Sequence, residues 1–417
     1  MSQLKPVSLA ARDLLVDLAK AEHLQLISNA MTALLQERPE VWLPNPVPLD
    51  RVEKVVVPLD RVGTEQGFSG SRVFVAYFAD RDCEVDPSSP FILKIGRFDK
   101  LTEEYGNAAA WPKVGDDHRF AKPFFIHATR ASDHDGTAAA VMAAPFSSGK
   151  MFQYPSNWNF EHRDLWQMLK RTDEGSAALV RYLHSTYNVL RRVHCAGRTH
   201  YVRSGLNFAE EYKWYIRELD AAFRMIPVAL FGSAAKTEAF GREWPNPLLL
   251  VDRILKLRTF TGAFGAVHGD LHPRNVVVDT DSLSYVIDFG WASANGHVVR
   301  DFALMDINVR AMALSAHLER SSVEEIARYL HPNDRQASST DPRVTACQDV
   351  IRDGIWAKVN EWQVVQNWEV EYLIPLFLIG FGLLKYLETA RNQSALQLTI
   401  LALAERLEGS VQSLERS

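Results

Sequence analysis

Cysteine is scarce in this sequence, and its three cysteines, Cys83, Cys195 and Cys347, lie far apart. An odd number of widely separated cysteines fits neither a disulfide framework nor a cysteine-rich zinc site. We expect idle or buried thiols in a reducing compartment. The first residues also lack a basic start followed by a long apolar run, so no secretory signal is expected and a cytoplasmic location is favoured.

Long apolar runs and long basic runs are missing as well. The most apolar stretch, residues 373–384, is shorter than the ~20 residues that span a bilayer, and Pro375 interrupts it. This stretch is typical of a buried core helix, and no membrane partner is expected. The net charge is −5, and binding to phosphate backbones needs a positive surface, so nucleic acid is a poor candidate partner.

The sequence divides into three segments. Leucines recur at helix-compatible spacing over residues 8–37, and four prolines follow within residues 39–48. We predict that residues 1–49 form an N-terminal helical extension with a proline-rich connector. The extension would cap the main body or bind a protein partner.

Residues 50–145 contain short β-branched or aromatic runs, and the remainder of the chain is helical in pattern. Predicted strands cover residues 55–57, 72–78, 91–95 and 138–144, with a turn-rich segment at 80–90 and a helix near 101–111. Within residues 146–417, helices are predicted at 179–194, 213–224, 300–330 and 345–410. The fold class expected is therefore α+β, with a small β-rich lobe before a large helical lobe.

The residues with the clearest chemistry surround a predicted hairpin. Strands at 276–278 and 285–287 flank a turn, so that Asn275 stands at one end of the hairpin and Asp288 at the other. Asp270 lies one loop away, and Pro273 keeps that loop out of a regular helix. Carboxylate and amide oxygens are the ligands that Mg²⁺ prefers, together with substrate phosphates.

This set of residues suits phosphoryl transfer, which needs neutralised phosphates and a positioned nucleophile. Asp288 would bind the metal ion, and Asn275 would bind the same ion or a second one. Asp270 would orient the attacking hydroxyl and accept its proton. His268 and His272 alone would suggest zinc, but no His-Glu-x-x-His motif is present and Pro273 opposes a helix that presents both rings.

The same segment resembles the aminoglycoside phosphotransferase and choline kinase group, which is related to the protein kinases. That group carries His-Gly-Asp-x-His-x-x-Asn followed by Ile-Asp-Phe-Gly. The matching residues here are His268, Gly269, Asp270, His272, Asn275 and 287–290. The resemblance implies a catalytic base at Asp270 and metal ligands at Asn275 and Asp288. His268 and His272 would brace the loop, and Asp301 would be a structural aspartate.

The resemblance also implies a nucleotide site earlier in the chain. Residues 67–71 form a Gly-Ser turn whose backbone at Gly67, Ser69, Gly70 and Ser71 would approach the phosphates, although such a turn also occurs in a plain hairpin. It is not a P-loop, because no Gly-x4-Gly-Lys-Ser/Thr is present.

Lys94 stands in an apolar strand, where a buried ammonium needs an anion. It would meet the nucleotide phosphates and a helical glutamate, Glu104 in preference to Glu103; the alternative is an edge-strand lysine that faces water. Met142 and Ala143 would line the adenine pocket.

The expected protein is thus a two-lobed, protein-kinase-like phosphotransferase. Residues 50–145 would form the N-lobe and 146–417 the C-lobe. A loop over residues 225–247 and the helices beyond residue 360, with Glu369 and Glu371, would shape the acceptor pocket. It would transfer the γ-phosphoryl group of ATP, or of GTP, to a hydroxyl of a small molecule with Mg²⁺. No Ala-Pro-Glu follows Asp-Phe-Gly, unlike in protein kinases. The alternatives are a nucleotide-binding pseudokinase with a regulatory role, and a kinase-like enzyme that modifies a protein or transfers AMP.

Overall fold

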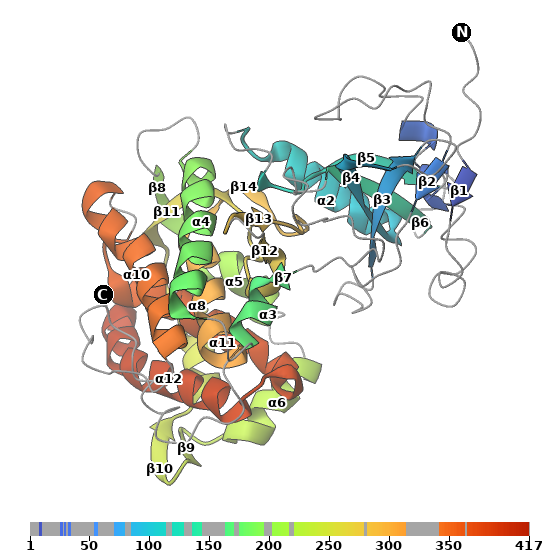
Figure 1. Cartoon of the computed structure of the whole chain (residues 1–417). Coiled ribbons are helices and arrows are strands. Elements are labelled where there is room, and N and C mark those ends of the chain that lie inside the picture. Colours follow the sequence, from blue (N-terminus) through green and yellow to red (C-terminus); the bar gives the residue numbers. More distant parts are fainter. Residues whose placement is uncertain are drawn as a thin grey trace. The chain divides into compact units, whose positions relative to one another are not determined.

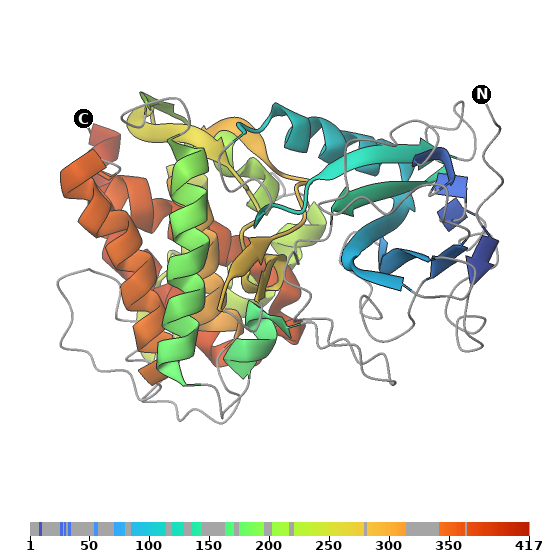
Figure 2. The same cartoon turned by 45° about the horizontal axis from the view of Figure 1, so that its top comes forward.

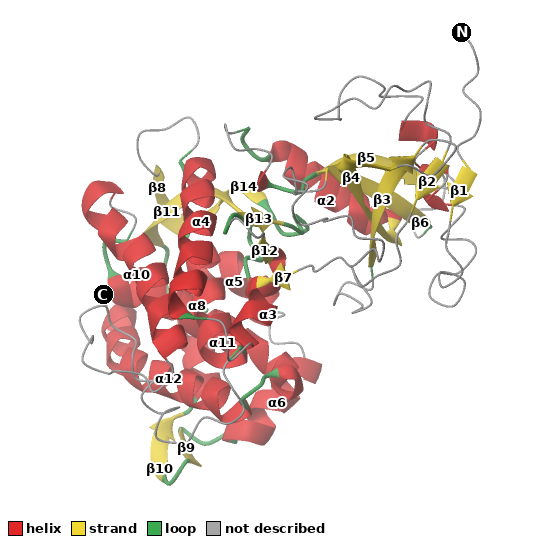
Figure 3. Ribbon diagram, viewed as in Figure 1, coloured by secondary structure: helices red, strands yellow, loops and turns green. Residues whose placement is uncertain are grey.

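The computed structural model divides the chain into two compact units, which are described one at a time. The first unit comprises Met1–Arg163 and Val277–Ser293, and the second comprises Asp164–Val276 and Ala294–Ser417. Figure 1 labels their elements, and Figure 3 shows strands predominating in the first unit and helices in the second. The structure describes residues 8–10, 26–27, 29–30, 32–34, 54–56, 71–79, 85–113, 119–128, 136–143, 163–170, 175–195, 202–216, 221–278, 282–313, 342–362 and 365–416.

A six-stranded sheet forms the first unit, in the order β1-β2-β3-β4-β6-β5. Its strands are β1 Ser8–Ala10, β2 Lys54–Val56, β3 Arg72–Ala79, β4 Val85–Arg97, β5 Pro123–Ala128 and β6 Thr137–Ala143. All neighbouring pairs are antiparallel except β1 with β2. Helix α2, Phe98–Ala110, packs on β5 and β6 and buries Leu101 against Phe98, Ile126 and Ala128. The strand-rich character predicted for this part of the chain is confirmed.

Two predictions in this unit were wrong. Ser8–Ala10 is a strand paired in parallel with β2, although its leucine spacing predicted a helix. The strand that it pairs with lies more than 40 residues away, and a local sequence pattern cannot indicate so distant a partner. Further along the predicted helix, the described residues between 26 and 34 are helical. Residues 85–90, predicted as a turn, extend β4, because an irregularity between Tyr77 and Ala79 accommodates them.

A hairpin from later in the chain completes the first unit. β12, Val276–Val278, is followed by β13, Ser284–Val286, and both are buried. The hairpin is tied to the sheet unit by a bridge between Phe120 and Val286 and by the Arg119 Nε bond to the Ser284 carbonyl, 2.5 Å. Asp288 therefore belongs to the same unit as β4 and α2.

Helices dominate the second unit. They are α3 Leu165–Lys170, α4 Ser176–His194, α5 Phe208–Ile216, α6 Ala221–Phe231, α7 Pro247–Ile254, α8 Val299–Ile307, α10 Pro342–Trp362, α11 Ile374–Gly382 and α12 Gln393–Arg416. Helical turns also occur at η5 Pro273–Asn275, η6 Asn308–Met312, η7 Glu369–Leu373 and η8 Leu383–Thr389. Helices α4 and α10 run side by side in both views (Figures 1 and 2). The α+β fold class predicted from the sequence is confirmed.

Short strands complete this part of the chain. β14 Ser293–His297, β11 Phe260–Val267 and β8 Val202–Leu206 form one sheet in that order, β9 Lys236–Ala239 pairs with β10 Arg242–Pro245, and β7 spans Arg163–Asp164. The prediction of a loop over 225–247 was therefore wrong, since the segment holds most of α6 and the β9–β10 hairpin. Asn246 then caps α7 by accepting from the Leu248 N–H at 3.0 Å.

The apolar segment near residue 375 lies in the core of the second unit. By length and composition alone, Glu369–Thr389 is apolar enough to cross a membrane, with a mean hydropathy of 1.6. However, 78% of it is buried inside the protein, and α11 packs against α5, α8 and α12. The prediction of a buried core helix is confirmed. Cys195 and Cys347 are free thiols.

Several predicted segments lie outside the described residues. They include the proline-rich connector at 39–48, the segment boundary at 145/146, Cys83, and residues 314–330 of the helix predicted at 300–330.

Candidate functional site

Lys94 is buried in the interior of the first unit. It lies on β4 between the buried residues Leu93 and Ile95, and its strand is paired on both sides, with Val73 of β3 and Ala140 of β6. The alternative of an edge-strand lysine facing water is therefore excluded. A buried ammonium at this position must be matched by negative charge.

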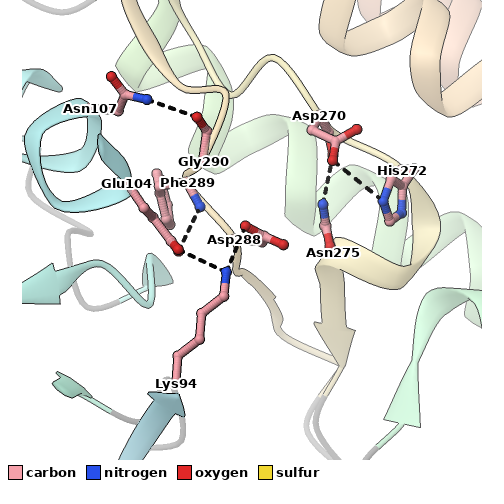
Figure 4. A network of polar contacts seen from close by, with 9 residues as sticks. All are labelled: Lys94, Glu104, Asn107, Asp270, His272, Asn275, Asp288, Phe289 and Gly290. Atoms are coloured by element: carbon pink, nitrogen blue, oxygen red, sulfur yellow. Dashed lines mark hydrogen bonds and ion pairs between the residues drawn. The ribbon is translucent and has the colours of Figure 1, made fainter. Parts of the chain in front are cut away.

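Two carboxylates provide that charge. The Lys94 Nζ donates to Glu104 Oε2 at 2.8 Å and to Asp288 Oδ1 at 3.0 Å (Figure 4). Burial by itself would lower the pKa of Lys94, but the charges of Asp288 and Glu104 outweigh it and raise the pKa above its usual value. Lys94 is therefore an ammonium group at neutral pH.

Helix α2 supplies the glutamate that the sequence favoured. Glu104 is buried and its second oxygen, Oε1, accepts from the Phe289 N–H at 3.2 Å, so that it contacts Lys94 and the Asp-Phe-Gly segment together. Glu103 instead lies on the exposed face of α2 and pairs with Lys100 at 3.0 Å. The pairing of Lys94 with Glu104, which the resemblance favoured over a pairing with Glu103, is present.

The Asp-Phe-Gly segment is fixed by contacts of the two residues that follow Asp288. Asn107 Nδ2 of α2 donates to the Gly290 carbonyl at 2.8 Å, and the Phe289 ring meets Trp111 edge-on at 5.0 Å. Asp288 itself has a positive φ of 67°, which is uncommon outside glycine and turns its carboxylate towards Lys94 (Figure 4). Its side chain keeps 38% exposure, so the carboxylate is accessible to a ligand.

The remaining predicted nucleotide-binding residues are only partly described. Ser71 is buried, and a Cβ placed on Gly96 would come within 2.5 Å of its Oγ. Met142 and Ala143 lie on β6, with backbones paired to Ile92 and Phe91. Gly67, Ser69 and Gly70 lie outside the described residues.

The loop that carries Asp270 belongs to the second unit and follows β11 directly. Gly269 adopts a φ of 80°, a conformation that glycine takes without a steric penalty. After it, the His272 N–H donates to the Asp270 carbonyl at 2.9 Å and starts a tight turn. Pro273 opens the following 3₁₀ helix, which ends at Asn275. The proline thus acts as the sequence predicted, by keeping the loop out of an α-helix.

Asn275 closes the loop through its side chain. Its Nδ2 donates to the Asp270 carbonyl at 2.8 Å, and its N–H donates to the His272 carbonyl at 2.9 Å. Because the amide nitrogen is used for this bond, Oδ1 is the atom of the side chain that remains to bind a cation. The His272 Nε2 lies 3.7 Å from Asp270 Oδ2.

A buried aspartate on α8 anchors the start of the same loop. Asp301 accepts from the His268 N–H at 2.9 Å and from the Gly269 N–H at 2.8 Å. Burial alone would raise the pKa of Asp301, but the hydrogen bond and charge of His194 and the contacts of His268 lower it below its usual value. Asp301 is thus an ionised structural residue, the role that the resemblance implied.

Sequence reasoning missed two residues that also hold this loop. His194, at the end of α4, contacts Asp301 Oδ2 through Nε2 at 3.0 Å. The Tyr215 hydroxyl, at the end of α5, donates to the Gly269 carbonyl. The helical periodicity of α4 placed His194 on its buried face, but neither residue carries a motif that points to the loop.

Two of the predicted site residues offer oxygen atoms of the chemical type that binds magnesium. In the first unit Asp288 offers a partly exposed carboxylate, and in the second unit Asn275 offers an amide oxygen. Oxygens of both kinds are ligands that Mg²⁺ accepts. Among the described residues, no group of three or more His, Cys, Asp or Glu side chains could hold a metal.

A buried histidine next to this region gives the protein an expected acid sensitivity. His297 lies at the end of β14, and its Nδ1 is bonded to the Tyr212 hydroxyl at 2.6 Å. Burial, with the charges of Arg300 and Arg203, lowers the pKa of His297 from 6.5 to about 3. Between these values the unfolded chain binds a proton that the folded chain does not, so this contribution to stability is complete above pH 6.5 and is lost as the pH falls towards 3.

We expect the free energy of unfolding to fall by about 2 kcal/mol from this group between pH 7.5 and pH 5. Urea unfolding at the two pH values measures the change. In His297→Gln the difference between the two pH values should shrink by that amount, whereas the exposed His184→Gln should retain it. An unchanged difference in His297→Gln would contradict the prediction.

Comparisons with known proteins give one family and several solved structures. The profile of the family described as "Ternary complex associated domain 9" matches residues 179–379, just under half of the chain. No curated protein matches the sequence.

Three of the similar solved structures have the names of enzymes that phosphorylate small molecules. A choline kinase from Streptococcus pneumoniae is 14% identical, with 88% of this chain and 100% of that chain covered and a TM-score of 0.35. A macrolide 2'-phosphotransferase from Brachybacterium faecium is 12% identical (84% and 93% covered, TM-score 0.34). An aminoglycoside phosphotransferase from Alicyclobacillus acidocaldarius is 14% identical (92% and 98% covered, TM-score 0.34). All three TM-scores are below 0.5.

Proposed function

We propose that this protein is a phosphotransferase with a two-lobed, kinase-like fold that moves the γ-phosphoryl group of ATP, or of GTP, to a hydroxyl group of a small molecule. Lys94, Glu104 and Asp288 would bind the nucleotide and its metal ion. Asp270 would act on the acceptor. The β-rich unit would form most of the nucleotide-binding lobe and the helical unit the acceptor lobe.

The observation that carries the proposal is the buried contact of Lys94 with both Glu104 and Asp288. Kinase-type catalysis requires a strand lysine paired with a helical glutamate, and an Asp-Phe-Gly aspartate in place beside them. Here the two Nζ distances are 2.8 and 3.0 Å, and Glu104 also accepts from the Phe289 N–H. A role confined to stability would be better met by apolar side chains, since buried ion pairs are weak sources of stability.

The reaction needs little covalent chemistry from the protein. The acceptor oxygen forms a bond to the γ-phosphorus, the bond from that phosphorus to the β–γ bridging oxygen breaks, and the nucleoside diphosphate leaves with the electron pair. Asp270 would take the hydroxyl proton as the new bond forms. Lys94 would hold the nucleotide phosphates. A magnesium ion held by Asp288 and Asn275 would neutralise charge on those phosphates.

Nucleotide consumption with a panel of acceptors tests the proposal. The full chain would be incubated with ATP or GTP, with Mg²⁺ or with EDTA, and with hydroxylated metabolites and antibiotics. We expect one acceptor class to release nucleoside diphosphate in the presence of Mg²⁺ and to gain one phosphate by mass spectrometry. A product that gains a nucleotide, or turnover that persists in EDTA, would contradict the proposal.

Asp288→Ala is expected to weaken binding of the magnesium–nucleotide complex at least about tenfold, a loss of ~1.4 kcal/mol. The physical reason is the loss of a metal-binding carboxylate. Titration calorimetry measures the affinity with Mg²⁺ and with EDTA, and the difference between the variant and the wild type should disappear in EDTA. Asp99→Ala, which removes an exposed carboxylate paired with Arg97, is the matched control. Equal affinities with Mg²⁺ would count against Asp288 as a ligand.

A second candidate is a nucleotide-binding module that regulates partner proteins. The family matched over residues 179–379 is described as associated with a ternary complex, which favours a role in assembly. Nucleotide-dependent association with a partner, without turnover of any acceptor, would support this candidate over the first.

A further inference from the structure

Tyr215 links a helix of the second unit to the residue directly before Asp270. It is the penultimate residue of α5, and the residue is 7% exposed. Its hydroxyl donates to the carbonyl oxygen of Gly269, a buried contact between residues 54 positions apart. The contact therefore depends on the tertiary packing of α5 and cannot form within the loop itself.

With this contact, Gly269 is held at both of its polar backbone atoms. Asp301 Oδ1 accepts from its N–H at 2.8 Å, and Tyr215 donates to its carbonyl. The Gly269 carbonyl and the Asp270 nitrogen belong to the same planar peptide group. Fixing that carbonyl therefore fixes the plane from which the Asp270 side chain projects. A glycine with a φ of 80° has the widest freedom to rotate if such a contact is lost.

The phenol of Tyr215 stays a hydrogen-bond donor over the working pH range. Burial raises its pKa well above the usual value; Arg300 acts in the opposite direction, and Asp270, Asp301 and Glu211 add to the rise. Because the phenol stays protonated, its single hydroxyl proton remains available for the hydrogen bond to the Gly269 carbonyl.

The position of α5 is set by close packing on α11. A Cβ placed on Gly382 would overlap the backbone carbonyl of Tyr215, so the two helices meet at a distance that only glycine allows. One turn earlier, the Tyr212 hydroxyl bonds His297 Nδ1 at 2.6 Å. The helix thus has two buried tyrosine hydroxyls with different partners, and one of them reaches the loop of Asp270.

We infer that Tyr215 is a positioning residue that orients Asp270 for proton transfer by holding the Gly269–Asp270 peptide in place. The inference rests on the phosphotransferase function proposed above. Tyr215 itself touches neither the nucleotide nor the acceptor in this role. Its loss is therefore felt in the turnover number and not in the affinity for nucleotide.

The test is Tyr215→Phe with Tyr212→Phe as its matched control. Both variants keep a buried ring on the same helix and lose one buried hydroxyl bond. Tyr215→Phe should lower kcat by ~10- to 100-fold, because small misplacements of a catalytic group have effects of that size. Its Kd for the magnesium–nucleotide complex should change by less than about twofold. Tyr212→Phe should retain a kcat within about twofold of the wild type.

A second measurement does not depend on turnover. Hydrogen–deuterium exchange of the amides in residues 268–272 should be faster in Tyr215→Phe than in the wild type and in Tyr212→Phe. If the wild-type chain turns over no acceptor, the proposed function fails, and exchange in this segment alone decides whether Tyr215 holds the loop. Unchanged exchange, or equal losses of kcat in the two variants, would overturn the inference.

Discussion

Replacing Asp270 by asparagine is expected to reduce turnover by ~10²–10⁴-fold, the usual contribution of a general base. Asparagine keeps the size of the side chain and can still point at a hydroxyl, but it cannot accept the proton. The backbone contacts of the loop, which involve the Asp270 carbonyl and the neighbouring residues, do not depend on the carboxylate. The affinity for magnesium–nucleotide should therefore be retained, and the folded structure with it.

Initial rates with the best acceptor, together with nucleotide titration, measure both expectations. Asp252→Asn is a suitable control, because Asp252 lies in an ion pair with Arg224 in which both side chains are substantially exposed, and such pairs contribute little. Turnover at the wild-type rate in Asp270→Asn would remove Asp270 from its proposed role. Loss of nucleotide affinity of the same size as the loss of rate would indicate a misfolded loop.

Lys94→Met is expected to destabilise the protein by about 3–5 kcal/mol and to abolish activity. The methionine fills the space of the lysine stem but leaves Glu104 buried without its partner. Burial already raises the pKa of Glu104 with Lys94 present, and removing the ammonium raises it further, so the glutamate takes up a proton or disrupts the contact between α2 and Phe289. Urea unfolding gives the change in the free energy of unfolding.

The double variant Lys94→Met/Glu104→Gln separates stability from function. The neutral glutamine removes the buried charge and its amide oxygen can still accept from the Phe289 N–H, so most of the lost stability should return. Activity should stay absent, because nothing replaces the ammonium at the phosphates. Lys100→Met, on the exposed face of α2, serves as the control for both measurements. An active double variant would show that Lys94 is only a structural residue.

The sequence was most informative where the site is built from short spacings. The tight turn from Asp270 to Asn275 follows from Pro273 and the residues around it, and the structure contains that turn. The pairing of Lys94 with Glu104 follows because a charged residue in an apolar strand needs a partner, and the next helix offers two. Burial of one glutamate and exposure of the other then settles which of the two binds.

The residues that could not be found from the sequence hold the site from a distance. Tyr215 and His194 reach the Asp270 loop from helices that end more than 50 residues earlier, and no periodic pattern records which buried residue touches which loop. The strand at Ser8–Ala10 was missed for the same reason, because its partner strand lies elsewhere in the chain. The sequence also did not predict the φ of 80° at Gly269 or the φ of 67° at Asp288.

The β12–β13 hairpin has a consequence for how this protein is made. Residues 277–293 belong to the same compact unit as the N-terminal sheet, yet more than a hundred residues of the other unit are synthesised between them. A nascent chain therefore cannot finish its first unit until residue 293 has left the ribosome. Until then Phe120 lacks both its bridge to Val286 and its ring contact with Phe289. A fragment that stops at Arg163 would lack these contacts permanently, and the apolar side chains that it leaves exposed make it a candidate for capture by chaperones.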